Sequence, residues 1–97
     1  MNANYPQLSI VEKSIVSGLR FPLHDVLRSA EHISQRRADA ERAMILGNNY
    51  KCKVKIIFED NDGLKQIETT IWSVTEKYVL IKTGMGIPLH RIHEVNI

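Results

Sequence analysis

The clearest pattern along the chain is an alternation of polar and apolar residues that begins near residue 50. One face of residues 51–58, taken as a strand, carries three lysines: Lys51, Lys53 and Lys55. The opposite face carries Cys52, Val54, Ile56 and Phe58. Because successive side chains of a strand point to opposite faces, this alternation predicts a strand with one apolar face, on which the small Cys52 thiol is buried.

Asp62-Gly63 is a strong hairpin signal that follows this strand and precedes a second alternating run, residues 64–74. One face of that run holds Ile67, Thr69, Ile71 and Ser73, and the other holds Gln66, Glu68, Thr70 and Trp72. The run is long for a single strand, so we expect a bend or bulge within it.

Three shorter strands are expected at 78–82, 87–89 and 92–97, after turns at 75–77 and 83–86. Pro88 cannot donate to a ladder, which favours an edge or a corner for its strand. Five short strands with tight turns predict a small bent antiparallel barrel over residues 50–97, since closing the sheet removes its exposed edges.

A period near 3.6 predicts an amphipathic helix over residues 23–47. Its apolar positions recur at spacings of three and four: Val26, Leu27, Ala30, Ile33, Ala40, Ala43 and Met44. Pro22 is expected near its start and Gly47 at its end. The mixed charges of residues 35–42 are typical of a solvated face, with Arg37 and Glu41 spaced for an ion pair. A phosphate-binding ridge of Arg36, Arg37 and Arg42 is the alternative.

Residues 1–22 leave two interpretations open, because 9–12 resemble a helix cap while 14–17 suit a short strand. The whole chain of 97 residues, with 43% apolar and 25% charged content, fits one domain. Its net charge of +2 lacks the basic excess of a dedicated nucleic-acid binder. Without a signal-peptide pattern or a membrane-length apolar run, we expect a cytoplasmic protein with no membrane partner.

The order of these parts, over roughly residues 24–97, resembles the Sm-like fold and within it bacterial Hfq, whose helix leads into a five-stranded bent barrel. Three positions of the final Hfq pattern agree: His90, Ile92 and Val95. Pro88, Leu89 and Arg91 stand where Hfq has tyrosine, lysine and alanine. In the third strand, Lys77 stands for glutamine, Tyr78 for phenylalanine, and Val79 matches.

The resemblance implies a homo-oligomeric ring, formed by edge pairing of the last strands, that holds single-stranded RNA. It places candidate RNA contacts at Lys77, Tyr78, His90 and Arg91. The strand lysines Lys51, Lys53 and Lys55 are further candidates, although lysines also keep an exposed strand soluble. Candidate contacts between subunits are Trp72, which falls on the polar face of its strand, and Ile87 and Leu89.

His90 and His93 lie in the densest polar cluster, beside Arg91 and Glu94. A metal site would need further ligands, and the other histidines are expected on the helix, so we predict neither a metal nor another cofactor. No serine or cysteine sits in a nucleophile motif, and we expect no enzyme. Two functions stay open: an oligomeric Sm-like protein that binds single-stranded RNA, and a protein-interaction or scaffold module with no nucleic-acid role.

Overall fold

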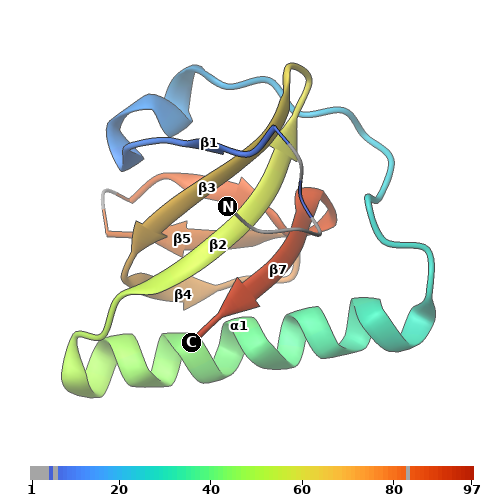
Figure 1. Ribbon diagram of the computed structural model, residues 1–97. Helices are drawn as coiled ribbons and strands as arrows, with labels where there is room; N and C mark the ends of the chain where they lie inside the picture. Colours follow the sequence, from blue (N-terminus) through green and yellow to red (C-terminus); the bar gives the residue numbers. More distant parts are fainter. Residues whose placement is uncertain (1–4, 6, 83) are drawn as a thin grey trace.

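The computed structural model describes residues 5, 7–82 and 84–97 and contains seven strands, one α-helix and two short 3₁₀ helices (Figure 1). The first elements are β1 (Ser9–Ile10), η1 (Lys13–Gly18) and α1 (Ala30–Tyr50). The hairpin and its continuation are β2 (Val54–Asp60), β3 (Gly63–Thr69) and β4 (Ile71–Val74). The last are β5 (Tyr78–Ile81), β6 (Gly86–Pro88), η2 (Leu89–Arg91) and β7 (Ile92–Asn96).

The strands form two sheets, in the orders β1-β3-β2-β7 and β4-β5-β6. All pairs are antiparallel except β1 with β3. The prediction of a mainly β protein with one helix is therefore confirmed, but the described strands do not close into one barrel. The expected bend is present, because β3 and β4 are separated by Thr70 alone and belong to different sheets.

The hairpin predicted from Asp62-Gly63 is present between β2 and β3, and it turns at Asn61-Asp62 with Asp60 paired to Gly63. The Asp60 carboxylate accepts bonds from the backbone N–H groups of Asp62 (3.0 Å) and Gly63 (3.1 Å) and from Lys65 Nζ (2.8 Å). Gly63 has φ +139°, a conformation that L side chains rarely adopt. The local sequence thus fixes both the position and the shape of this turn.

The core lies between the two sheets and α1, and most of it comes from the predicted apolar faces. Fully enclosed members are Ala40, Ala43, Ile56, Phe58, Ile71, Val79, Ile81, Ile87 and Ile92. Ile57 is buried on the other face of β2, so this central strand is covered on both sides. The prediction of a buried Cys52 is wrong: β2 begins only at Val54, and Cys52 is exposed in the connection that precedes it.

Helix α1 starts and ends later than the sequence predicted. Asp25 Oδ1 accepts a bond from the Leu27 N–H (2.7 Å), a local turn that competes with helix, and Ser29 is the N-cap. At the other end the helix passes Gly47 and closes at Lys51, whose φ of 56° is left-handed. Gly47 has a packing role instead, because a Cβ there would lie 2.7 Å from the Ile71 carbonyl oxygen.

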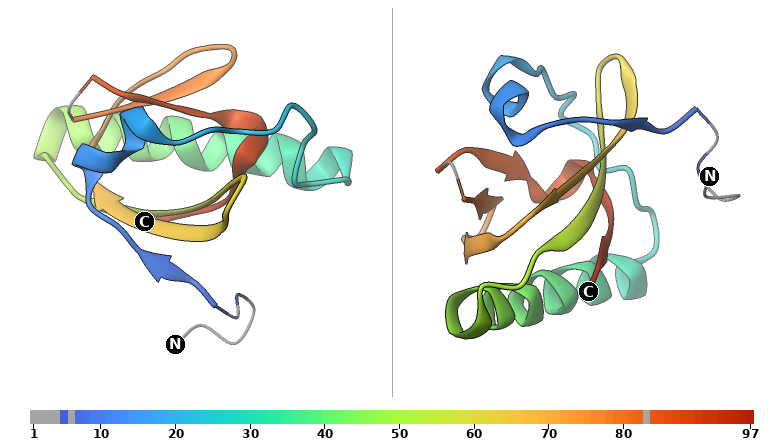
Figure 2. Two further views of the ribbon diagram at one scale, coloured as in Figure 1. Left: turned by 90° about the horizontal axis from the view of Figure 1, so that it is seen from above. Right: turned by 60° about the vertical axis from the view of Figure 1, so that its left-hand side comes forward.

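Helix α1 lies across one end of both sheets and contacts β4 and β7 (Figures 1 and 2). The segment before it, residues 19–29, is called the strap here. It leaves η1 and runs along the side of the molecule to the start of α1 (Figure 1). The two open interpretations of the N-terminal segment resolve into a short strand at Ser9–Ile10 and a 3₁₀ helix at Lys13–Gly18. Residues 1–4 and 6 lie outside the described part of the chain.

None of the helices formed by the described residues combines the length and the apolar character that crossing a bilayer requires.

Candidate nucleic-acid interface

A hollow of about 590 Å³ lies between the first half of α1, the β4–β5 turn, η2 and the strap. We call it the basic hollow, because its cations Arg36, Arg37 and Lys77 outnumber its carboxylates Asp25 and Glu76. His90 also lines it. Tyr78 lines it as well. The structure thus brings together three of the four residues that the family resemblance selected, although His90 lies 12 positions after Tyr78 in the sequence.

The β4–β5 turn is held in place by bonds at both ends. Within it, Thr75 Oγ1 accepts the Tyr78 N–H (2.9 Å). The Arg37 guanidinium donates to the carbonyl oxygens of Thr75 (3.2 Å) and Glu76, which ties the turn to α1. The Lys77 carbonyl oxygen accepts the N–H of Leu89 (2.9 Å), which ties it to η2. The position of Tyr78 against α1 and η2 is therefore set by the fold.

Tyr78 keeps 46% of its surface exposed although it belongs to a sheet. Its ring packs over Gly86, where an added Cβ would lie 3.1 Å from the ring carbon Cδ1. Glycine at this position therefore lets the ring lie close to β6. An aromatic ring supported from below and open to solvent is a suitable platform for a planar ligand.

His90 is half-buried and is bonded to the strap at two points. Its ring Nε2–H donates to the Pro22 carbonyl oxygen (2.9 Å), and its own carbonyl oxygen accepts the N–H of Val26 (2.9 Å). The ring faces the hollow with one nitrogen already engaged. His90 therefore shapes the wall of the hollow and holds the strap against η2.

Arg36 is buried and paired, and it is the exception to the predicted solvated face of residues 35–42, whose other charged residues are exposed or partly exposed. Only 6% of it is exposed. Its guanidinium bonds both oxygens of Asp25 (2.9 and 2.8 Å) and the Ile92 carbonyl oxygen (3.0 Å). Partial burial raises the pKa of Asp25, but the bonds from Arg36 and the Leu27 N–H outweigh it and the pKa lies below its ordinary value. The predicted Arg37–Glu41 pair is present at 3.8 Å.

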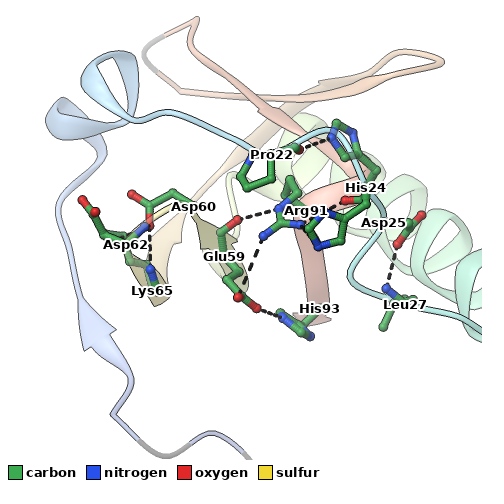
Figure 3. A network of polar contacts seen from close by, with 12 residues as sticks. Pro22, His24, Asp25, Leu27, Glu59, Asp60, Asp62, Lys65, Arg91 and His93 are labelled. Atoms are coloured by element: carbon green, nitrogen blue, oxygen red, sulfur yellow. Dashed lines mark hydrogen bonds and ion pairs between the residues drawn. The ribbon is translucent and has the colours of Figure 1, made fainter.

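Arg91 does not belong to the basic hollow. It is 2% exposed and donates through Nε to the Glu59 carbonyl oxygen (2.9 Å) and through a terminal nitrogen to the His24 carbonyl oxygen (3.0 Å) (Figure 3). Glu59 also accepts a bond from His93 Nε2 (2.8 Å). The candidate RNA contact at Arg91 is therefore a structural residue that joins the strap, β2 and η2, and its guanidinium is closed to solvent.

The prediction that Lys51, Lys53 and Lys55 share one strand is wrong, because β2 begins at Val54: Lys51 caps α1, Lys53 lies in the connection, and only Lys55 is on the strand. All three are exposed, but they lie at the other end of α1 from the basic hollow. Lys51 closes the helix 15 positions after Arg36, about 22 Å along the helix axis at 1.5 Å per residue. Lys55 also faces Glu68 across the β2–β3 pair. The candidate cations thus fall into two separate groups.

Two of the three candidate subunit contacts are buried within the subunit itself. Ile87 is fully buried and Leu89 is 6% exposed, and both belong to the hydrophobic core. Their side chains therefore have no free surface to offer a neighbour. Trp72 is 51% exposed on β4, as its place on the polar face predicted.

The histidine cluster does not assemble into a metal site within the described residues, where no three histidine, cysteine, aspartate or glutamate side chains converge. His24 lies in the strap and not on the helix, and its ring accepts a bond from Arg91 (3.3 Å). His93 is engaged by Glu59, and Glu94 accepts the hydroxyl of Tyr5 (2.7 Å).

Sequence reasoning missed the strap as part of the site. Leu23 and Asp25 line the basic hollow, and both fall in a segment that was assigned to the helix. The sequence does contain a local signal for the later helix start: an Asp-x-Leu turn at residues 25–27, followed by Ser29 as the helix cap.

No family model, no curated protein and no solved structure matches this chain, so its function must be argued from its own residues and geometry.

Proposed function

We propose that this chain is an oligomeric Sm-like protein that binds single-stranded RNA in the basic hollow. The observation that carries the proposal is the meeting of Tyr78 with Lys77, Arg37 and His90 around one hollow of about 590 Å³. Proteins that bind single strands combine cations that track the backbone with aromatic rings on which bases stack. This hollow offers both within one subunit.

The Sm-like part of the proposal is supported by the arrangement of the last strands. From β7 through β2, β3, β4 and β5 to β6, each strand pairs with or directly continues the next, and the break at Thr70 divides one long bent strand. That path is the one expected of a five-stranded bent barrel behind a helix. Its two ends, β6 and β7, are the edge strands that a ring would pair between subunits.

Each polar residue has a distinct role in the proposed binding. A base stacks on the exposed ring of Tyr78, and Lys77 neutralises a phosphate beside it. Arg37 already donates to the turn carbonyls, so it adds positive charge while holding the turn in position. His90 keeps the wall of the hollow closed through its bond to Pro22.

The direct test is binding of labelled uridine- and adenine-rich hexanucleotides, measured by fluorescence anisotropy at low salt. Tyr78→Ala should weaken binding about fivefold to 150-fold, the range for losing one stacked base. Tyr50→Ala is the matched control, because Tyr50 is 73% exposed at the far end of α1. Absence of binding by the unaltered protein at low salt would rule out the proposed function.

Oligomerisation is tested separately by light scattering across a concentration series. Edge pairing between subunits predicts a mass several times that of the 11.1 kDa chain. If the protein has the mass of one chain at high concentration, the proposed ring is wrong. RNA binding by the single subunit would then be decided by the anisotropy measurement alone.

The second candidate function is a protein-interaction or scaffold module, and the exposure of Trp72 favours it. About half of the surface of Trp72 is exposed to solvent. Trp72 lies on β4, the strand against which α1 packs. Exposed tryptophan is enriched at protein interfaces. This alternative predicts that Trp72→Glu changes the assembly mass or loses a protein partner, whereas Tyr78→Ala changes neither.

A further inference from the structure

Leu23 is the most exposed large apolar side chain of the described residues, at 93%. It stands at a boundary, because it lines both the basic hollow and a second hollow of about 350 Å³. Tyr78, Pro88 and His90 line both hollows as well. Leu23 and Tyr78 together therefore form an exposed apolar wall between the two hollows.

The two sides of this wall differ in chemistry. Arg37 and Lys77 line only the basic hollow. The second hollow, called the apolar hollow here, has an apolar lining of its own: Val16, Leu19, Phe21 and Met85. Met85 is also exposed, at 37%. The two hollows share Leu23 and Tyr78 and are together called the groove here. One half holds Arg37 and Lys77 beside Glu76, and the other half is lined mainly by apolar residues.

Leu23 is held in this exposed position by its neighbours on both sides. The Pro22 carbonyl oxygen accepts the His90 ring N–H, and the His24 carbonyl oxygen accepts the buried Arg91. Asp25 is bonded to Arg36. Because Pro22, His24 and Asp25 are each bonded, the segment is fixed on both sides of Leu23, and presenting this side chain to a ligand costs little further conformational entropy.

We infer that Leu23 is a base-contacting residue of the proposed RNA site. A nucleotide has an apolar-faced planar base at one end and an anionic phosphate at the other, which matches the two halves of the groove. The base lies against Tyr78 and Leu23 on the side of the apolar hollow, and its phosphate points toward Lys77 and Arg37. Cations beside an apolar hollow suit a single-stranded nucleic acid, because its bases are unpaired and can be turned out to contact the protein.

The inference rests on the proposed function and is tested with Leu23→Ser, which should not disturb folding because the side chain is almost fully exposed. Binding of a uridine hexanucleotide should weaken roughly fivefold, as expected when part of a base contact is lost. Ile10→Ser is the matched control, because Ile10 is 80% exposed on β1 and lines neither hollow.

A second probe separates base contact from charge. A hexamer of abasic ribose phosphates carries the same phosphates without bases, so Leu23→Ser should leave its affinity unchanged while Lys77→Gln weakens it. If the unaltered protein binds no RNA, the proposed function fails. If RNA binds and Tyr78→Ala weakens it but Leu23→Ser does not, or if Leu23→Ser weakens the abasic hexamer equally, the inference about Leu23 is overturned and the proposed function stands.

Discussion

Two arginines, Arg36 and Arg91, place full charges in the interior of a chain of only 97 residues. Each is bonded to a main-chain carbonyl of a distant segment, Ile92 for Arg36 and both Glu59 and His24 for Arg91. Buried charges are tolerated only when such bonds replace their hydration. These two side chains therefore fasten α1 and the strap to the β-sheet.

Replacing Arg91 by alanine should lower the free energy of unfolding by about 3 kcal/mol, because the buried packing of this side chain is lost and the partly buried carbonyl oxygens of Glu59 and His24 lose a charged donor. The measurement is urea denaturation followed by circular dichroism. Arg28→Ala is the control, since Arg28 is exposed in the strap and should change stability by less than about 0.5 kcal/mol. Equal effects of the two substitutions would show that the Arg91 bonds contribute nothing.

Asp25 and Asp60 make the free energy of unfolding depend on pH in the acidic range. Burial raises the pKa of both carboxyls, but the bonds from Arg36 and Leu27 to Asp25, and from Lys65 and the turn N–H groups to Asp60, lower the pKa below 3.8.

A lowered pKa in the folded state stabilises the protein fully above 3.8. That stability is lost as the pH falls through the folded pKa values. Thermal unfolding between pH 7 and pH 2.5 should show the melting temperature fall below about pH 4, more gently in Asp60→Asn than in the unaltered chain. Identical acid profiles of these two proteins would exclude the Asp60 contribution.

Secondary-structure elements were predictable where local chemistry decides them. The alternation around β2 and the Asp62-Gly63 signal placed the hairpin correctly. The excess length of residues 64–74 predicted a bend, which the structure places at Thr70. The helix ends were wrong because nonlocal packing uses Gly47 against β4, and a side-chain turn at Asp25 keeps the strap out of the helix.

Gly47→Ala tests this packing at the level of the helix. Alanine favours a helix by about 1 kcal/mol over glycine, so propensity alone predicts a more stable protein. Its Cβ would however lie 2.7 Å from the Ile71 carbonyl oxygen and 2.8 Å from a Thr70 methyl group. We expect a net loss of about 1–3 kcal/mol in urea denaturation, because α1 must move away from β4.

Gly18→Ala is the control for this effect, since nothing lies within 4 Å of a Cβ at that position. It should leave stability within about 0.5 kcal/mol of the unaltered protein. A stabilised Gly47→Ala variant would mean that α1 can shift from β4 without cost.

The candidate site was predictable only in part. Lys77, Tyr78 and His90 were selected by resemblance to a family pattern, and they do meet at the basic hollow. The role of the strap could not be anticipated, because the bond that places it joins Pro22 to His90 across 68 positions. Local periodicity carries no information on such contacts. Arg91 was misjudged for the same reason, since its burial depends on Glu59 and His24.

The molecule as a whole has a net charge of only +2, so the position of its cations matters more than their number. Arg37 and Lys77 line the basic hollow, whereas Lys51 follows Arg37 by 14 positions, about 21 Å along the axis of α1 at 1.5 Å per residue. Lys53 and Lys55 follow Lys51 at that end of the helix. An extended hexanucleotide could reach either group or both. The dependence of RNA binding on salt distinguishes these cases, because each neutralised phosphate releases counterions.

For single strands, the logarithm of the binding constant falls by about 0.7 per phosphate contact for each tenfold increase in salt. If RNA binds only at the basic hollow, its two cations Arg37 and Lys77 predict a slope of log K against log salt of about −1.4 per bound strand. If the strand also contacts Lys51, Lys53 and Lys55, the predicted slope is about −3.5. Anisotropy titrations from 25 to 250 mM salt, about one decade, should therefore give the shallow slope. Lys77→Gln should reduce it by about 0.7, while replacing Lys51, Lys53 and Lys55 together by alanine should leave it unchanged. A steep slope that the triple variant flattens would instead place the RNA on these three lysines, and the basic hollow would lose its role as the primary site.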